Sequence, residues 1–131
     1  MEENLEVDNK SEEKTLIEES ILLSIKKLLG ITKDEESFDT DIIIHINSVF
    51  TTLNQLGVGP ESGYRITSSE NKWSEFLQDY NQLESVKTYI YLKVKLVFDP
   101  PLNGSLMDSF KETIRELEWR LNVDVENMKG E

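Results

Sequence analysis

Apolar residues recur at helical spacing in four separate stretches of the chain. In the first stretch, an isoleucine-rich stripe predicts a helix from about Thr15 to Leu29, which Gly30 would end. In the second, a similar stripe predicts a helix over residues 39–56, with Gly57 as its stop. The stripe positions are Ile17, Ile21, Ile25 and Leu28 in the first helix and Ile42, Ile46, Val49, Leu53 and Leu56 in the second, with Phe50 beside them.

The second half of the chain predicts two more helices. Residues 82–98 carry apolar side chains on two faces, which is typical of a central helix. The pair Pro100–Pro101 prevents that helix from continuing, and a last helix is expected after a cap at Asn103 or Ser105, running to about Asn122. The apolar positions are Leu83, Val86, Ile90, Val94 and Val97, then Tyr89, Leu92 and Leu96, and in the last helix Leu106, Phe110, Ile114, Leu117 and Leu121.

Residues 57–72 separate the two pairs of predicted helices and contain three glycines and a proline. Around the short run Tyr64–Ile66 they predict a projecting loop or a small β-hairpin that contributes nothing to the core. A short helical turn is expected next, at Trp73–Leu77. The predicted fold is therefore all-α, a four-helix bundle with a projecting loop or small β-hairpin between its second and third helices.

The charge distribution adds a division of the chain into three parts. The 131 residues suit one domain, and 14 Lys+Arg against 26 Asp+Glu give a net charge of -12. Residues 1–20 hold eight acidic and two basic residues and so carry -6 of that charge. We expect residues 1–14 to be an acidic flexible extension, residues 15–122 a helical domain and residues 123–131 a C-terminal arm. An acidic chain without a basic patch is a poor ligand for nucleic acid or anionic membranes, and this acidic start, with no basic and apolar leader, indicates a cytoplasmic protein.

Candidate catalytic and metal-binding chemistry is sparse. The chain has no cysteine, and its one histidine, His45, has no nucleophile or ligand motif near it in sequence. The acidic run from Asp34 to Asp41 lacks the glycine and closing glutamate of a calcium loop, so it is better explained as complementing the dipole of the helix that follows. The glycines of residues 57–63 lack phosphate-loop spacing. We therefore predict no enzyme activity, no cofactor and no metal.

Several apolar residues stand on polar faces, and these are the candidates for contact with partner proteins. Trp119 points away from the stripe of its helix, Ile44 lies opposite the core face of its own helix, and further candidates lie in the loop and in the tail. The tail alternates apolar and polar residues, as in an edge-adding strand or a frayed terminus. Alternatively, the N-terminal segment or the loop covers Trp119 within one chain. The partner-binding candidates are Tyr64, Arg65, Ile66, Trp73, Ile44, Trp119, Val123, Val125 and Met128.

Three segments resemble a known family as a set. They are Ile21–Ile31 with the acidic connector after it, Phe38–Pro60, and Val86–Pro101 leading to the ELEWRLN ending of Glu116–Asn122. Together they resemble the small head-tail connector proteins, also called neck adaptor or head completion proteins, of tailed phages and prophages of Gram-positive hosts. The resemblance covers roughly residues 16–125, and its more specific parts are the DPP turn and the ELEWRLN ending.

This resemblance implies a structural subunit of a ring that docks below the portal and joins the DNA-filled head to the neck or tail. Its implied partners are copies of itself, the portal protein and further neck or tail proteins, while DNA passes through the channel without specific binding. The implied location is the virion neck, after assembly in the cytoplasm of the host bacterium. The implied contacts lie in the loop Tyr64–Ile66 and the arm Val123–Met128. Two alternatives from other classes are an acidic regulatory or inhibitory protein that mimics nucleic acid and a carboxylate-dependent hydrolase.

Overall fold

The computed structural model describes the backbone of residues 2–129 and the side-chain surroundings of residues 9–79 and 81–128. In this part of the chain it contains six α-helices and no strand, and 70% of the protein is helical, which confirms the all-α class. The helices are α1 (Glu2–Glu19), α2 (Ile21–Leu28), α3 (Asp39–Gln55), α4 (Trp73–Phe76), α5 (Tyr80–Phe98) and α6 (Gly104–Lys129).

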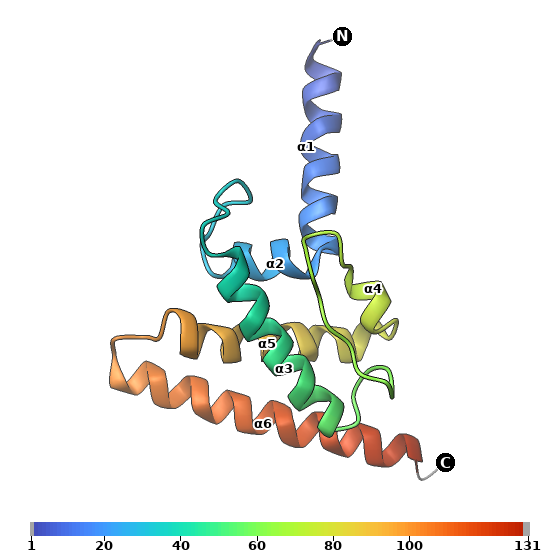
Figure 1. Ribbon diagram of the computed structural model, residues 1–131, viewed down its shortest axis with the longest axis vertical. Coiled ribbons are helices and arrows are strands. Elements are labelled where there is room, and N and C mark those ends of the chain that lie inside the picture. Colours follow the sequence, from blue (N-terminus) through green and yellow to red (C-terminus); the bar gives the residue numbers. More distant parts are fainter. Residues whose placement is uncertain (1, 130–131) are drawn as a thin grey trace.

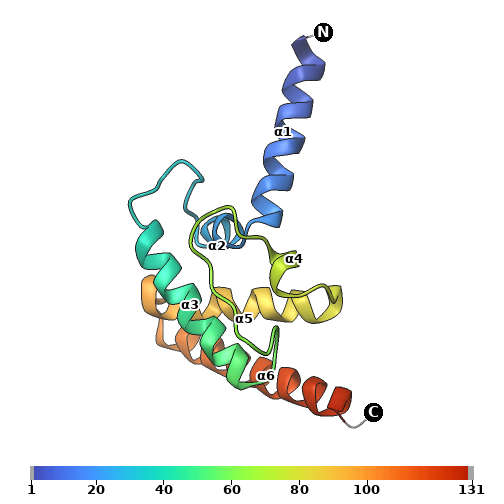
Figure 2. The same ribbon diagram turned by 45° about the vertical axis from the view of Figure 1, so that its right-hand side comes forward.

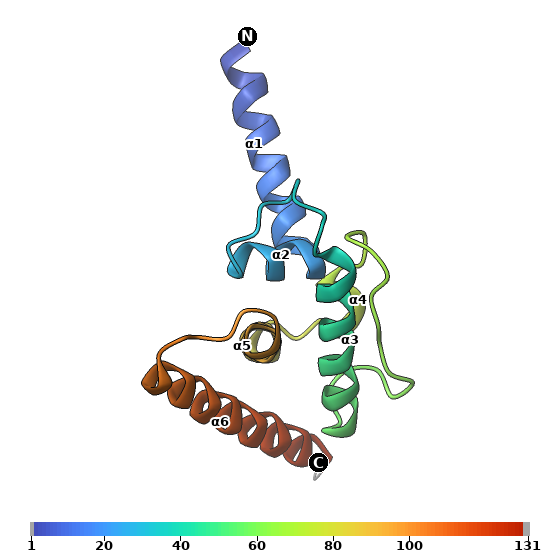
Figure 3. The same ribbon diagram turned by 60° about the vertical axis from the view of Figure 1, so that its left-hand side comes forward.

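Helix α5 lies at the centre of the fold, as its two apolar faces predict. It contacts α2, α3 and α6, and Figure 3, which looks along α5, shows these three helices on three of its sides. The core side chains of α5 are Leu83, Val86, Tyr89, Ile90, Leu92 and Val94, all of them buried. Helix α3 crosses α5 in both of the other views (Figures 1 and 2). Four helices surround the core, but they cross one another, so the regular four-helix bundle is not confirmed.

The first predicted helix is divided in two at Ser20. Helix α1 ends at Glu19 and points away from the body, whereas α2 runs across the top of the core (Figure 1). Ser20 has extended backbone angles, its Oγ accepts a hydrogen bond from the backbone N–H of Leu23 at 3.2 Å, and the N–H of Ile21 donates to the carbonyl of Asn71 at 3.1 Å. The break therefore has a tertiary cause, because the hydrogen bond that would continue α1 goes to the loop after α3.

Most of the segment predicted to be a flexible extension is helical in the structure. Its glutamate and lysine residues have high intrinsic helix propensity, and the sequence prediction weighed only their inability to form a core. Ion pairs of Glu13 with Lys33 and of Glu19 with Lys72, each at 3.7 Å, connect the base of α1 to the body. Both pairs are exposed, so they contribute little to stability.

The loop between α3 and α4 folds back along α3, and the expectation that it holds no core residue is wrong. Val58 and Ile66 are buried in the main core. The Asn47 side chain of α3 replaces a strand partner: its Oδ1 accepts from the N–H of Ile66 at 2.7 Å, and its Nδ2 donates to the Ile66 carbonyl at 2.9 Å. Gly59 has a φ of 89° and sits so close to the Phe76 ring of α4 that a Cβ would overlap it.

Helix α6 starts at the predicted cap and ends later than predicted. The Asn103 Oδ1 accepts from the N–H groups of Ser105 and Leu106 at 2.8 and 3.3 Å, which is N-cap geometry. The helix then continues past Asn122 to Lys129, so the alternating tail does not form a strand. Val125 is buried beside Gly57, because it continues the helical stripe of the last helix by one more turn.

Candidate protein-interaction surfaces

Two large apolar side chains stand in solvent on the outer faces of helices. Trp119 on α6 is 67% exposed, and Ile44 on α3 is 59% exposed. Close to Trp119 on the same helix, Glu116 and Arg120 form an exposed ion pair at 2.7 Å. In the described chain neither residue is covered by the N-terminal segment or by the loop, which was the intramolecular alternative. Both residues are therefore free to contact another protein.

Tyr64 and Arg65 lie where the loop passes over α3. Tyr64 is half-buried, its ring meets Phe50 edge-on with centroids 5.2 Å apart, and its hydroxyl donates to Glu75 at 3.1 Å. Partial burial, helped by the Glu75 hydrogen bond, raises the pKa of Tyr64 to about 12. The pKa of Glu75 is lowered, chiefly because its carboxylate also accepts from the backbone N–H of Lys72. These bonds hold the loop, while the Arg65 side chain stays exposed.

A hollow of about 520 Å³ lies between α3 and this loop. Asn47, Phe50, Thr51 and Asn54 of α3 line one side, and residues 62–65 line the other. The hollow is open, its lining mixes polar and apolar groups, and its one charged lining residue is Arg65. Its shape suits contact with a protein surface better than enclosure of a small molecule.

Three of the predicted partner-binding residues are buried in the core of the chain itself. Ile66, Trp73 and Val125 belong to the main hydrophobic cluster. The Trp73 Nε1 donates to Ser24 Oγ of α2 at 2.9 Å, and the Lys87 ammonium lies 5.5 Å from the centre of the Trp73 ring. These side chains are almost entirely buried, and they hold the loop, α4 and the end of α6 against the body.

The remaining candidates lie near the end of α6. Val123 is half-buried and Met128 is exposed. Met128 and Val125 line a hollow of about 470 Å³ together with α4 and residues 57–60 of the loop. The C-terminal end of α6 is thus brought beside the loop, although the two are far apart in the sequence. Figure 2 shows this end of α6 close to the end of α3.

The structure also exposes apolar residues that sequence reasoning assigned to the core or passed over. They gather at helix ends, where the stripe of each helix extends past the element it packs against. Phe38 and Phe98 meet edge-on there, with ring centroids 5.5 Å apart. For Leu102 the sequence did contain a signal of exposure, because this leucine directly follows Pro100–Pro101, where the chain cannot be helical. The exposed residues are Leu28, Phe38, Val97, Leu102 and Leu106.

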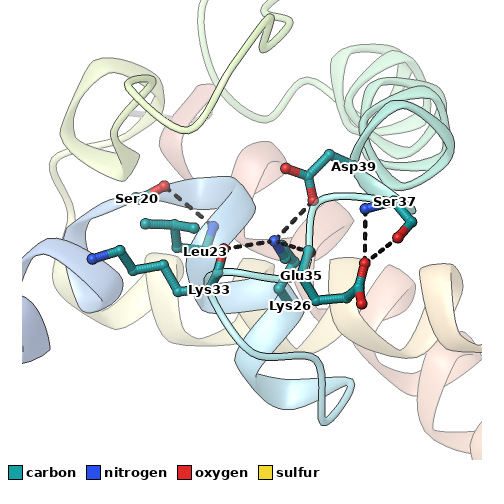
Figure 4. A network of polar contacts seen from close by, with 7 residues as sticks. All are labelled: Ser20, Leu23, Lys26, Lys33, Glu35, Ser37 and Asp39. Carbon is teal, nitrogen blue, oxygen red and sulfur yellow. Dashed lines mark hydrogen bonds and ion pairs between the residues drawn. The ribbon is translucent and has the colours of Figure 1, made fainter.

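A buried lysine connects α2 to α3 through the segment of residues 31–38 between them (Figure 4). The Lys26 ammonium lies 2.8 Å from Asp39 Oδ1 and donates to the carbonyls of Glu35 and Lys33 at 2.7 and 3.2 Å. The Glu35 carboxylate in turn accepts from the hydroxyl and the N–H of Ser37, which lowers the pKa of Glu35. The ammonium thus makes one ion pair and two hydrogen bonds, and this network fixes the segment of residues 31–38 at the start of α3.

The part of the chain that the structure describes offers little for other chemistry. Among its residues no group of three or more His, Cys, Asp or Glu side chains could hold a metal ion. None of the helices within residues 2–129 has both the length and the apolar character needed to cross a bilayer. His45 is half-buried on α3.

A scan against protein-family models decides the class of the protein. The model described as "Phage connector protein" matches residues 21–128. The chain belongs to the phage connector protein family. The match begins at the first residue of α2 and ends near the end of α6, so α1 lies outside it. Searches of curated proteins and of solved structures gave no significant match to the connector.

Membership in this family defines the general role of the connector. It is a structural component of a phage virion with a role at the junction of head and tail, and it interacts with other head and tail proteins. The family resemblance carried by the three sequence segments is thereby confirmed, while the Gram-positive host remains a prediction.

Proposed function

We propose that the connector is one subunit of a closed ring that docks below the portal and joins the DNA-filled head to the neck or tail. The observation that carries this proposal is the exposure of Trp119 on the outer face of α6, together with membership in the connector family. Tryptophan is enriched at binding hot spots, and it is costly to leave in water. A protein whose role is structural has no other evident use for it.

Within such a ring, each subunit meets its neighbours through different patches on its two sides. A head-to-tail contact of this kind closes into a ring when the rotation between subunits divides a full turn. The patches that support it are the exposed Trp119 with the half-buried Val123 on α6, and the exposed Ile44 on α3. We assign contacts with the portal or the next ring to Tyr64 and Arg65 and to Met128 at the end of α6.

The DNA channel is the second part of the proposal. A ring through which DNA slides benefits from carboxylates, because they repel phosphate and prevent the duplex from sticking to the wall. The net charge of -12 is in agreement with this role. DNA would then pass through without specific binding, and assembly would take place in the cytoplasm of the host.

Mass measurement tests the proposal against the alternative of an acidic nucleic-acid mimic. The purified connector is measured by native mass spectrometry, alone and mixed with purified portal. A ring, or a stoichiometric complex with the portal, is the expected result. A small species that ignores the portal but binds basic proteins with steep salt dependence would identify the mimic instead. Imaging of the neck of purified virions then gives the stoichiometry.

A further inference from the structure

Helix α1 is unusual in this fold because nearly all of its side chains that the structure describes face solvent. From Asn9 to Glu19 every side chain is exposed except that of Ile17, which is half-buried. Its main helix contact is with α2 at its base, and Figures 1 to 3 show the rest of it standing clear of the body. A largely polar helix that packs only at its base gains little stability from the core. Contact with a partner would stabilise it.

The junction at Ser20 presents this helix in a defined direction. The Ser20 Oγ donates to the carbonyl of Ser69 at 2.7 Å, and the N–H of Ile21 donates to the carbonyl of Asn71 at 3.1 Å. Both acceptors belong to one short stretch of the loop, so the loop clamps the turn between α1 and α2. Helix α1 is therefore held out from the body and not folded back onto it.

We propose that α1 is a docking arm for a basic surface on a different protein of the virion. The inference rests on the proposed function, since it takes the connector to be part of a phage neck. Charge complementarity selects the partner. Residues 1–20 carry -6 and the remainder of the chain carries the other half of the total of -12, so the arm itself is repelled by DNA and by acidic surfaces of neighbouring copies in the ring. A surface rich in lysine and arginine is attracted.

An apolar contact point lies at the base of the arm. Leu16 is 54% exposed and lines a hollow of about 300 Å³ with Leu23. Lys33 and Lys72 also line the hollow, and both are paired with glutamates of α1. An apolar side chain of the partner that enters this hollow would cover Leu16 and add hydrophobic contact to the charge attraction. The arm also lies outside residues 21–128, which the family model matches.

The test uses purified DNA-filled heads that carry the portal, titrated with the full-length connector. The double variant Glu12→Gln/Glu18→Gln removes two exposed charges of α1. Its affinity for the heads should fall roughly 2- to 30-fold, because each exposed charge contact contributes about 0.2–1 kcal/mol. Its salt dependence should also become shallower. The matched control, Glu36→Gln/Glu84→Gln, removes two exposed charges elsewhere and should bind like the wild type.

Cross-linking identifies the surface that the arm meets. The connector has no cysteine, so a single cysteine in place of Lys10 can carry a photoreactive benzophenone in the assembled particle. The expected adduct joins α1 to a net-positive surface of another protein. An adduct to a second connector or to DNA, or equal affinities of the two double variants, overturns the inference and leaves the proposed function standing. If the wild-type connector does not bind the heads at all, the proposed function fails as well.

Discussion

Replacing Lys26 by methionine removes the ammonium group that holds the segment of residues 31–38, while it keeps most of the apolar length of the side chain. The Lys26 side chain is 1% exposed and that of Asp39 is 26% exposed. Loss of the ammonium leaves the Asp39 carboxylate and the carbonyls of Lys33 and Glu35 without their donor. The reverse variant, Asp39→Asn, leaves a buried ammonium without its counter-charge.

These two changes should differ in cost because the two partners differ in exposure. Lys26→Met leaves three acceptors without their partner, and a fully buried unpaired acceptor costs about 1–3 kcal/mol. Because water can reach Asp39 and the largely exposed residues 31–38, the total loss in the free energy of unfolding should be only about 2–4 kcal/mol. Asp39→Asn should cost about 3–5 kcal/mol, the usual result of leaving a buried charge unpaired. In the double variant no unpaired charge remains, so its cost should be at least about 2 kcal/mol below the sum of the single costs.

Urea unfolding followed by circular dichroism measures all of these free energies. Lys27→Met is the matched control, because Lys27 is the exposed neighbour of Lys26, and it should change stability by no more than about 0.5 kcal/mol. Additive costs in the double variant, or a cost for Lys26→Met no larger than that of the control, would refute the reasoning. Such a result would mean that water already reaches the ammonium in the folded protein.

Three further predictions concern the surface, the loop and the response to pH. Trp119→Ala should leave the circular dichroism spectrum unchanged but weaken the assembly seen by native mass spectrometry. The control Asn122→Ala, also on the exposed side of α6, should not weaken assembly. Unchanged assembly of Trp119→Ala would remove Trp119 from the interface. Gly59→Ala should lower the free energy of unfolding by about 3 kcal/mol, through backbone strain and overlap with the Phe76 ring of α4. Gly30→Ala should cost only about 1 kcal/mol, because Gly30 has a similar φ but open space around it. Equal urea midpoints for the two variants would contradict this. Because burial raises the pKa of Tyr64 from 10.0 to about 12, the folded state binds the phenolic proton more tightly, so this contribution is complete below pH 10 and is lost as the pH rises to about 12. The thermal unfolding temperature of Tyr64→Phe should therefore fall less steeply with rising pH across that window than that of the wild type.

The helix pattern could be predicted largely from the sequence. The second predicted helix, residues 39–56, corresponds to α3 (Asp39–Gln55), and the third, residues 82–98, corresponds to α5 (Tyr80–Phe98). In both cases a long apolar stripe lies within the segment and a glycine or proline stop follows shortly after it, so no distant contact is needed to recognise them. The cap at Asn103 is local for the same reason.

The candidate surface was predictable only in part. Spacing on a helix placed Trp119 and Ile44 on outer faces, because helical geometry alone decides which side of the stripe a residue takes. In the irregular segments spacing gives no such rule. Ile66 and Trp73 were candidates for the surface, yet they are buried because Asn47 and Ser24, on other helices, bind them.

The sequence by itself determined the helical class, the helix bounds that have local stops, the acidity and the family of the connector. Tertiary structure alone decided the break at Ser20, the burial of the loop residues, the continuation of α6 and the role of Lys26. Three of these depend on a group from a distant element: Asn71 for Ser20, Asn47 for Ile66, and Asp39 for Lys26. A local pattern can show that a residue is apolar or charged, but only the packed chain shows which partner satisfies it.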